Sequence, residues 1–218
     1  MGFALKAVIE GFYGVYYTHP ERLSLLRFLA GQGFDAYIYG PKNDRHHRRR
    51  WRNPYPEWIM GQFAETVSSG AEASVEFWYS LAPGVDIGYG SERDFQALTA
   101  KLQGFLDIGV RGFALLLDDI PPRLSDPGDA LSFDSLGHAQ AHLCNRTLEW
   151  LRGRDPSCRL LMCPTDYHGL PPFPASLRRL GEELHPDIGV FYTGPQVCSA
   201  EIDAASAAAF AEAVGRAP

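Results

Sequence analysis

The sequence lacks paired cysteines, long apolar runs and a recognisable leader. Its four cysteines include no C-x-x-C pair, which argues against a zinc site of the usual spacing. No apolar run is long enough to cross a bilayer, and the first residues contain neither the apolar core nor the cleavage site of a signal peptide. These absences predict a cytoplasmic protein without a metal or other cofactor, whose cysteines are free, buried thiols.

Positive charge is also scarce, because 26 acidic residues outnumber 20 basic ones and give a formal net charge of -6. Nucleic-acid-binding domains usually have the opposite balance, so neither a nucleic acid nor a membrane is expected as a partner. The exception is the basic run at residues 45–52, which includes Trp51, a ring on which a base could stack. Because the whole chain is acidic, a solvated loop or helix face is the favoured interpretation.

The remaining composition is that of an ordinary globular protein. Hydrophobic residues make up 45% and charged residues 21%, close to the average, and 218 residues are enough for one domain with a sizeable core. There is no internal repeat or low-complexity linker, which predicts a single domain over residues 1–218. The aromatic content of 12% suits a hydrophobic core and a sugar-binding cleft equally well.

Short β-rich runs alternate with helical patterns along the whole chain. Strands are predicted at residues 7–13, 35–39, 74–81, 112–119, 159–163 and 188–192. Helices are predicted at residues 20–29, 58–69, 92–106, 135–152, 176–184 and 201–214. Strands separated by helices pair in parallel, so the fold class is α/β.

Two architectures fit this alternation, a doubly wound open sheet and an eight-stranded TIM barrel. Several chemically active side chains lie at or just past the ends of predicted strands, namely Tyr13, Lys42, Asp118, Asp119, Tyr167 and Thr193. Active sites of α/β barrels collect at that face, whereas open sheets bind mainly at one switch point. Contributions from several strand ends therefore favour the barrel, although only about six β/α units are present.

The strongest chemical signal is the adjacent pair Asp118 and Asp119 at the end of an apolar strand. Two carboxylates that share a site tend to separate in pKa, which leaves an acid beside a base. Glycosidases need that combination. A loop start at which both are solvated, or a helix N-cap, explains the same pair; a metal site is less favoured, because partners are lacking nearby.

Three weaker motifs also have structural explanations, which are favoured when the Gly11 and histidine motifs are taken alone. Gly11 allows close backbone approach to a ligand and Tyr13 offers a hydroxyl, but a tight turn with a core aromatic explains both. Lys42 can donate to a sugar hydroxyl or form a salt bridge. His138 and His142 are one helical turn apart without a metalloprotease glutamate, which favours surface or packing roles.

In combination, these stretches resemble glycoside hydrolase family 84, the O-GlcNAcases and related hexosaminidases. The matching segments, in family order and spacing, are Val8–Gly14, Tyr37–Lys42, His47–Arg52, Ala82–Gly84 with Asp86 and Ile87, Phe113–Ile120, Cys163–Tyr167, and Tyr192–Pro195 with Val197. The resemblance implies a TIM-barrel fold and a retaining β-N-acetylglucosaminidase, in which the acetamido oxygen of the substrate attacks the anomeric carbon. Terminal β-linked GlcNAc, above all protein O-GlcNAc, is the implied substrate.

The resemblance also implies a role for each site residue. Asp118 would stabilise the acetamido N–H while the oxazoline forms, and Asp119 would act as general acid and then base. The sugar-binding residues implied by the family pattern are Gly11, Tyr13, Lys42, Tyr167, Thr193 and Val197.

The family pattern continues into a seventh strand with a Trp-Asp-Asn segment and an Asn-Asp pair, neither of which occurs in this sequence. The prediction is therefore a barrel that is incomplete at its C-terminal side, with open edges that favour self-association. The alternative function is a non-catalytic glycan-binding or interaction module.

Overall fold

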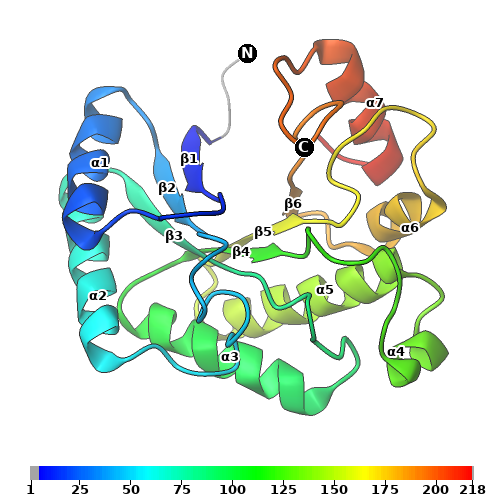
Figure 1. The fold of residues 1–218 in the computed structure, drawn as a ribbon, viewed down its shortest axis with the longest axis horizontal. Helices are drawn as coiled ribbons and strands as arrows, with labels where there is room; N and C mark the ends of the chain where they lie inside the picture. Colours follow the sequence, from blue (N-terminus) through cyan, green and yellow to red (C-terminus); the bar gives the residue numbers. More distant parts are fainter. Residues whose placement is uncertain (1–4, 218) are drawn as a thin grey trace. The chain divides into compact units, whose positions relative to one another are not determined.

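A computed structural model describes residues 5–217, which form six strands and seven helices (Figure 1). The strands are β1 (Ala7–Glu10), β2 (Ala36–Tyr39), β3 (Glu76–Leu81), β4 (Gly112–Leu116), β5 (Arg159–Cys163) and β6 (Gly189–Val190). The helices are α1 (His19–Gly31), α2 (Glu57–Glu72), α3 (Glu92–Asp107), α4 (Pro127–Ser132), α5 (Leu136–Arg154), α6 (Ala175–Glu183) and α7 (Ala204–Val214).

The order of the strands decides between the two predicted architectures. The sheet runs β1-β2-β3-β4-β5-β6, in the order of the chain. The pairs β1–β2, β2–β3 and β5–β6 are parallel. A doubly wound sheet reverses its strand order at a switch point, whereas strands of a TIM barrel follow one another in sequence. The fold is therefore α/β of the TIM-barrel type, with six β/α units in the described part of the chain.

The predicted elements are all present, with differences at their boundaries. Strand β1 ends at Glu10 and β4 at Leu116, each three residues before its predicted end. The polar segments that follow belong to loops, because their backbone leaves the sheet. The short helix α4 was not predicted from the sequence, although Asp126 caps its first turn by accepting hydrogen bonds from the backbone N–H groups of Gly128 and Asp129.

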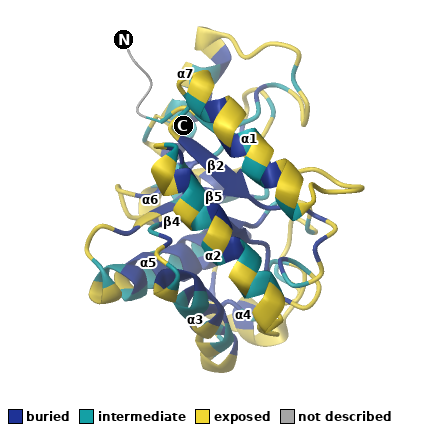
Figure 2. Ribbon diagram, turned by 90° about the vertical axis from the view of Figure 1, so that its left-hand side faces the viewer, coloured by how far each residue is buried: buried dark blue, intermediate teal, exposed yellow. Residues whose placement is uncertain are grey.

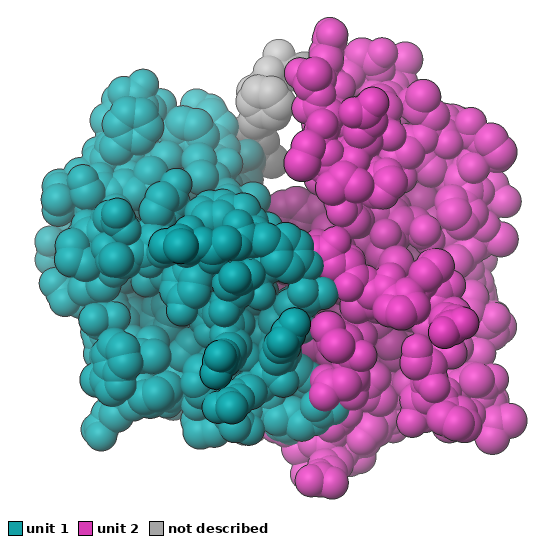
Figure 3. All heavy atoms as spheres, in the orientation of Figure 1, with its two compact units in different colours: residues 1–82, 97–113 teal, residues 83–96, 114–218 magenta. Residues whose placement is uncertain are grey.

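The chain divides into two compact units (Figure 3). Unit 1 comprises residues 1–82 and 97–113, and unit 2 comprises residues 83–96 and 114–218. In unit 1, α1 contacts α2 and β2, and α2 contacts β3. Figure 2 shows β2 as buried and the outer surfaces of α1 and α2 as largely exposed. The four residues of β2 are all buried, as expected for a parallel strand covered on both faces.

Aromatic side chains form much of the core of unit 1. They are Tyr39, Tyr55, Phe63, Phe77, Tyr79 and Phe105. The rings of Tyr79 and Phe105 stack with centroids 3.5 Å apart. The hydroxyls of Tyr39 and Tyr55 both donate to the buried carboxylate of Asp44, at 2.7 and 2.6 Å. A large share of the aromatic content therefore serves packing in this unit.

In unit 2, the long helix α5 packs against α6, and α6 against α7. Gly137 lies at the beginning of α5, beside Ser176 at the beginning of α6. Its backbone N–H donates to the hydroxyl of Ser176 at 2.8 Å. A Cβ atom at Gly137 would lie 1.9 Å from the Ser176 carbonyl oxygen. The contact between α5 and α6 at this point therefore requires glycine.

The prediction of buried thiols holds for three of the four cysteines. Cys144, Cys158 and Cys163 are free and buried, but Cys198 is exposed. Cys198 lies in the loop after β6, where the chain turns between residues 196 and 199, so no neighbouring element covers it. None of the helices in residues 5–217 is both long and apolar enough to span a membrane.

Candidate active site

The aspartate pair lies in unit 2, directly after β4. Leu117 is fully buried, Asp118 is partly buried and Asp119 is exposed. Asp119 has a φ of 51°, in the left-handed region that non-glycine residues seldom adopt, although aspartate and asparagine tolerate it better than most. Neither aspartate caps a helix, because the next helix is capped by Asp126. The backbone therefore leaves the extended conformation of the apolar strand at the exposed carboxylate of Asp119.

The backbone that carries the pair is fixed by hydrogen bonds to Leu117. Its N–H donates to the Cys163 carbonyl at 2.8 Å. Its carbonyl oxygen accepts from the Thr165 hydroxyl at 2.7 Å and from Gln140 Nε2 at 3.3 Å. Gln140 is buried and also donates to the Thr165 hydroxyl at 2.8 Å. Helix α5 and the loop after β5 therefore position the residue that immediately precedes Asp118.

Tyr167 is the predicted site residue whose environment is coupled most clearly to the pair. It is 8% exposed. Burial raises the pKa of its hydroxyl to about 12, and the negative charges of Asp119 and Asp118 act in the same direction. The hydroxyl therefore stays protonated at neutral pH and can donate a hydrogen bond in the vicinity of both carboxylates.

Thr193 lies in the loop after β6, which is joined to the Tyr167 loop through the backbone. The Thr193 N–H donates to the Tyr167 carbonyl at 3.0 Å, and the Gly169 N–H donates to the Gly194 carbonyl at 2.9 Å. The Thr193 hydroxyl donates to the Gln196 carbonyl at 3.0 Å. Val197, in the same loop, is 53% exposed. Thus Thr193 is held beside Tyr167, whereas the Val197 side chain projects into solvent.

Gly11, Tyr13 and Lys42 belong to unit 1, where their two loops meet. The Lys42 backbone N–H donates to the Phe12 carbonyl at 3.1 Å, which joins the loop after β1 to the loop after β2. Lys42 is 8% exposed and Tyr13 57% exposed. Arg48 donates from Nη1 to the Tyr13 hydroxyl at 2.8 Å. The tight-turn interpretation with a core aromatic is therefore wrong for Tyr13, which lies on the surface.

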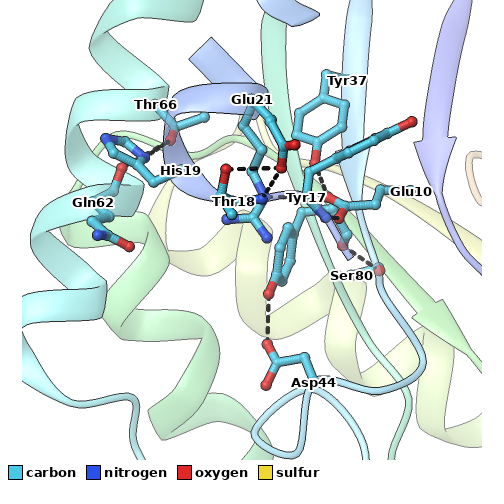
Figure 4. Close-up of polar contacts among 12 residues, drawn as sticks. Glu10, Tyr17, Thr18, His19, Glu21, Tyr37, Asp44, Gln62, Thr66 and Ser80 are labelled. Atoms are coloured by element: carbon cyan, nitrogen blue, oxygen red, sulfur yellow. Dashed lines mark hydrogen bonds and ion pairs between the residues drawn. The ribbon is translucent and has the colours of Figure 1, made fainter. Parts of the chain in front are cut away.

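A buried carboxylate stabilises the beginning of the Gly11 loop. Glu10 is 1% exposed and accepts hydrogen bonds from the Tyr17 N–H at 2.8 Å, from Arg22 Nε at 3.2 Å and from the Tyr37 hydroxyl (Figure 4). These donors offset the cost of burying the charge. Glu10 therefore fixes the end of β1, and with it the position of Gly11.

His47 joins the basic segment to the end of β3. The ring is fully buried, and Nδ1 donates to the Ser80 carbonyl at 2.8 Å. The His47 carbonyl accepts from the Ala82 N–H at 3.0 Å. Burial lowers the pKa of His47 to about 4, against a smaller opposing contribution from the Ser80 hydrogen bond. The imidazole is therefore neutral at physiological pH.

The buried imidazole predicts a loss of stability in mild acid. The unfolded chain takes up the His47 proton near pH 6.5, but the folded chain takes it up only near pH 4. The contribution is fully present above pH 6.5 and is lost as the pH falls toward 4, by up to about 3 kcal/mol. Urea unfolding at a series of pH values should show a shallower decline for His47→Gln than for wild type. Equal declines, or the same change in the exposed control His168→Gln, would contradict this assignment.

The remaining sequence signals are structural. Trp51 is fully buried, so it offers no surface on which a nucleic-acid base could stack, and the basic segment forms turns between β2 and α2. His138 and His142 both pack on the ring of Phe133. No group of three or more His, Cys, Asp or Glu side chains within residues 5–217 is arranged to hold a metal ion.

Comparisons with known proteins agree with the family predicted from the sequence. The sequence model described as beta-N-acetylglucosaminidase matches residues 6–218. The proteins named O-GlcNAcase of Rattus norvegicus and Mus musculus are each 36% identical to the chain over 219 residues. Each match covers 98% of this chain but only 24% of the relative, so the chain spans about a quarter of their length.

A solved structure supports the same relationship. An aspartate-to-asparagine mutant of the O-GlcNAc hydrolase of Thermobaculum terrenum superimposes with a TM-score of 0.95 at 35% identity. That match covers 98% of this chain and 46% of the other. The sequence and structure matches both extend over nearly the whole chain, and the chain belongs to the β-N-acetylglucosaminidase family.

Proposed function

We propose that the chain is the catalytic barrel of a retaining β-N-acetylglucosaminidase that hydrolyses terminal β-linked GlcNAc. The observation that carries this proposal is the Asp118–Asp119 pair, held after β4 through Leu117 and coupled electrostatically to Tyr167. Adjacent carboxylates in unequal environments suit acid–base chemistry on a glycosidic bond. The names of the relatives support GlcNAc as the sugar.

In this mechanism the acetamido oxygen of the substrate is the nucleophile, so the protein needs no nucleophile of its own. Asp118, the more buried aspartate, stabilises the acetamido N–H as positive charge develops on the oxazoline. Asp119, the exposed one, reaches the leaving oxygen, donates its proton and later deprotonates water. The protonated hydroxyl of Tyr167 donates to the oxazoline region.

The other predicted residues bind the sugar. Lys42 and the carbonyl of Gly11 contact its hydroxyls, and Tyr13 forms a wall of the site. Thr193 and Val197 line the acetamido pocket; the exposed position of Val197 requires its loop to close on the ligand. Protein O-GlcNAc is the proposed substrate class, because the curated relatives are named for it.

Three further sequence predictions stand as proposals beside this one. Residues 1–218 act as a single catalytic domain, and their location is the cytoplasm. The end strands of the sheet order, β1 and β6, provide edges through which a second copy pairs.

The test is the stereochemistry of hydrolysis. Proton NMR of a reaction with an aryl β-N-acetylglucosaminide should show the β-anomer of GlcNAc as the first product. Adding fluorine atoms to the acetamido methyl should slow the reaction progressively, because fluorine withdraws electron density from the attacking oxygen. The α-anomer as first product, or indifference to fluorine, would exclude the proposed mechanism.

The second candidate function is a glycan-binding module without catalysis. The described residues supply six strands, whereas a closed barrel of this type has eight, so turnover by residues 1–218 themselves is what has to be measured. Binding of GlcNAc without turnover, by folded protein, would select this candidate over the hydrolase.

A further inference from the structure

Unit 1 contains a cavity of about 320 Å³. The proposed mechanism gives a role to only part of its lining. Its lining includes two predicted sugar-binding residues, Tyr13 and Lys42, and extends from them along the basic segment to Arg45, Arg48 and Arg49. The cavity therefore begins where the sugar hydroxyls are proposed to bind and continues into a cluster of guanidinium groups.

The charge of this cavity is strongly positive. The carboxylate in its lining, Asp44, is buried and already accepts the hydroxyls of Tyr39 and Tyr55, and the backbone N–H of His46 at 2.8 Å. Those donors direct its oxygens into the protein core. Lys42 and the three arginines thus share the lining with one carboxylate, which is bonded to other groups. A concave surface lined mainly by one sign of charge concentrates the potential.

The arginines differ in how firmly they are held. Arg48 donates to the Tyr13 hydroxyl, and its guanidinium lies 5.6 Å from the centre of the Tyr13 ring. Arg45 and Arg49 are exposed and form no ion pair with any residue in the range 5–217. Arg48 therefore shapes the wall beside Tyr13, whereas Arg45 and Arg49 can turn toward a ligand. Planar guanidinium groups bind carboxylates and phosphates with two parallel hydrogen bonds.

We propose that this cavity binds an anionic substituent, a carboxylate or a phosphate, attached through a hydroxyl of the GlcNAc that Lys42 contacts. The inference rests on the proposed function, because it takes the sugar to lie at Lys42 and Tyr13. It extends the proposed substrate class from protein O-GlcNAc, whose sugar is neutral, to GlcNAc conjugates that carry negative charge on the sugar. A nucleic acid is a poorer occupant, since Trp51 is buried and the chain has a net charge of -6.

The test is calorimetric titration of the wild-type chain at low ionic strength with three sugars. They are neutral N-acetylglucosamine, N-acetylglucosamine 6-phosphate and N-acetylmuramic acid, whose lactyl ether provides a carboxylate. At least one anionic sugar should bind about tenfold more tightly than the neutral one, and the arm that shows the gain identifies phosphate or carboxylate. Inorganic phosphate should compete with the anionic sugar.

The double variant Arg45→Gln/Arg49→Gln should remove that advantage and leave binding of neutral N-acetylglucosamine unchanged. Both residues are exposed, so folding is not at risk. The matched control is Arg27→Gln/Arg93→Gln, which removes the same charge from exposed positions on α1 and α3 and should retain the advantage.

Three results would overturn the inference. Equal affinity of wild type for neutral and anionic sugars leaves the hydrolase proposal standing but rejects the anion site. If Arg27→Gln/Arg93→Gln loses the affinity advantage of the anionic sugar to the same extent, the advantage is a general effect of net charge. Failure of all three sugars to bind contradicts both this inference and the proposed function on which it rests.

Discussion

Replacing Asp119 with asparagine should lower the hydrolysis of a β-N-acetylglucosaminide with a poor leaving group by about 10²- to 10⁴-fold. Asparagine has the shape of the carboxylic acid but cannot transfer a proton to the leaving oxygen. An aryl group such as 2,4-dinitrophenol departs readily as an anion, so it needs little protonation. The loss of hydrolysis rate in Asp119→Asn should therefore become much smaller as the leaving group becomes more acidic. Rates for a series of substituted aryl glycosides would measure this dependence.

Asparagine is the right substitute at this position because of the backbone. Asp119 has a φ of 51°, which asparagine tolerates better than alanine, so the variant isolates the chemistry from backbone strain. Asp118→Asn provides the contrast, since its role in stabilising the oxazoline N–H does not depend on the leaving group. Asp107→Asn, exposed on α3, should leave the rate unchanged. Parallel losses for Asp119→Asn and Asp118→Asn across the series would contradict the division of roles.

The fold could be predicted to a large extent from the sequence because hydrophobic periodicity is a local property. The apolar run at residues 113–117 became the buried strand β4 and the residue after it, and α5 followed the predicted helix closely. The boundaries were less accurate where a strand ends in polar residues. Composition does not reveal the residue at which a strand leaves the sheet, as at Glu10 and Leu116.

The candidate site could be predicted only in part, because its support comes from residues distant in sequence. Gln140 is 23 residues from Leu117 and reaches the Leu117 carbonyl from α5. Its sequence context, between two histidines, gives no indication of that contact. From the sequence, Thr165 was noted only as part of the segment Cys163–Tyr167 that resembles the family, with no role of its own. The left-handed backbone of Asp119 likewise has no sequence signature, since aspartate adopts such a conformation only when neighbouring contacts impose it.

The same dependence on distant contacts makes Gly137 a position at which a substitution should strongly affect folding of unit 2. Gly137→Ala should destabilise the protein by about 4 kcal/mol or more. The added Cβ would lie 1.9 Å from the Ser176 carbonyl oxygen and 2.8 Å from its carbon, and a backbone group cannot move aside as a side chain can. Separating α5 from α6 would also break the hydrogen bond from the Gly137 N–H to the Ser176 hydroxyl. Urea unfolding gives the change in free energy directly.

Gly153, near the other end of the same helix, is the matched control. Nothing lies within 4 Å of a Cβ built there, so Gly153→Ala should stabilise the protein by up to about 1 kcal/mol through helix propensity alone. The two substitutions are chemically identical and differ only in their surroundings. If they change the free energy of unfolding in opposite directions, the difference comes from the close approach of α5 to α6. A loss of less than about 1 kcal/mol in Gly137→Ala would show that α6 can shift at little cost. In that case Gln140, one helical turn further along α5, could not be regarded as a rigid support for the Leu117 carbonyl.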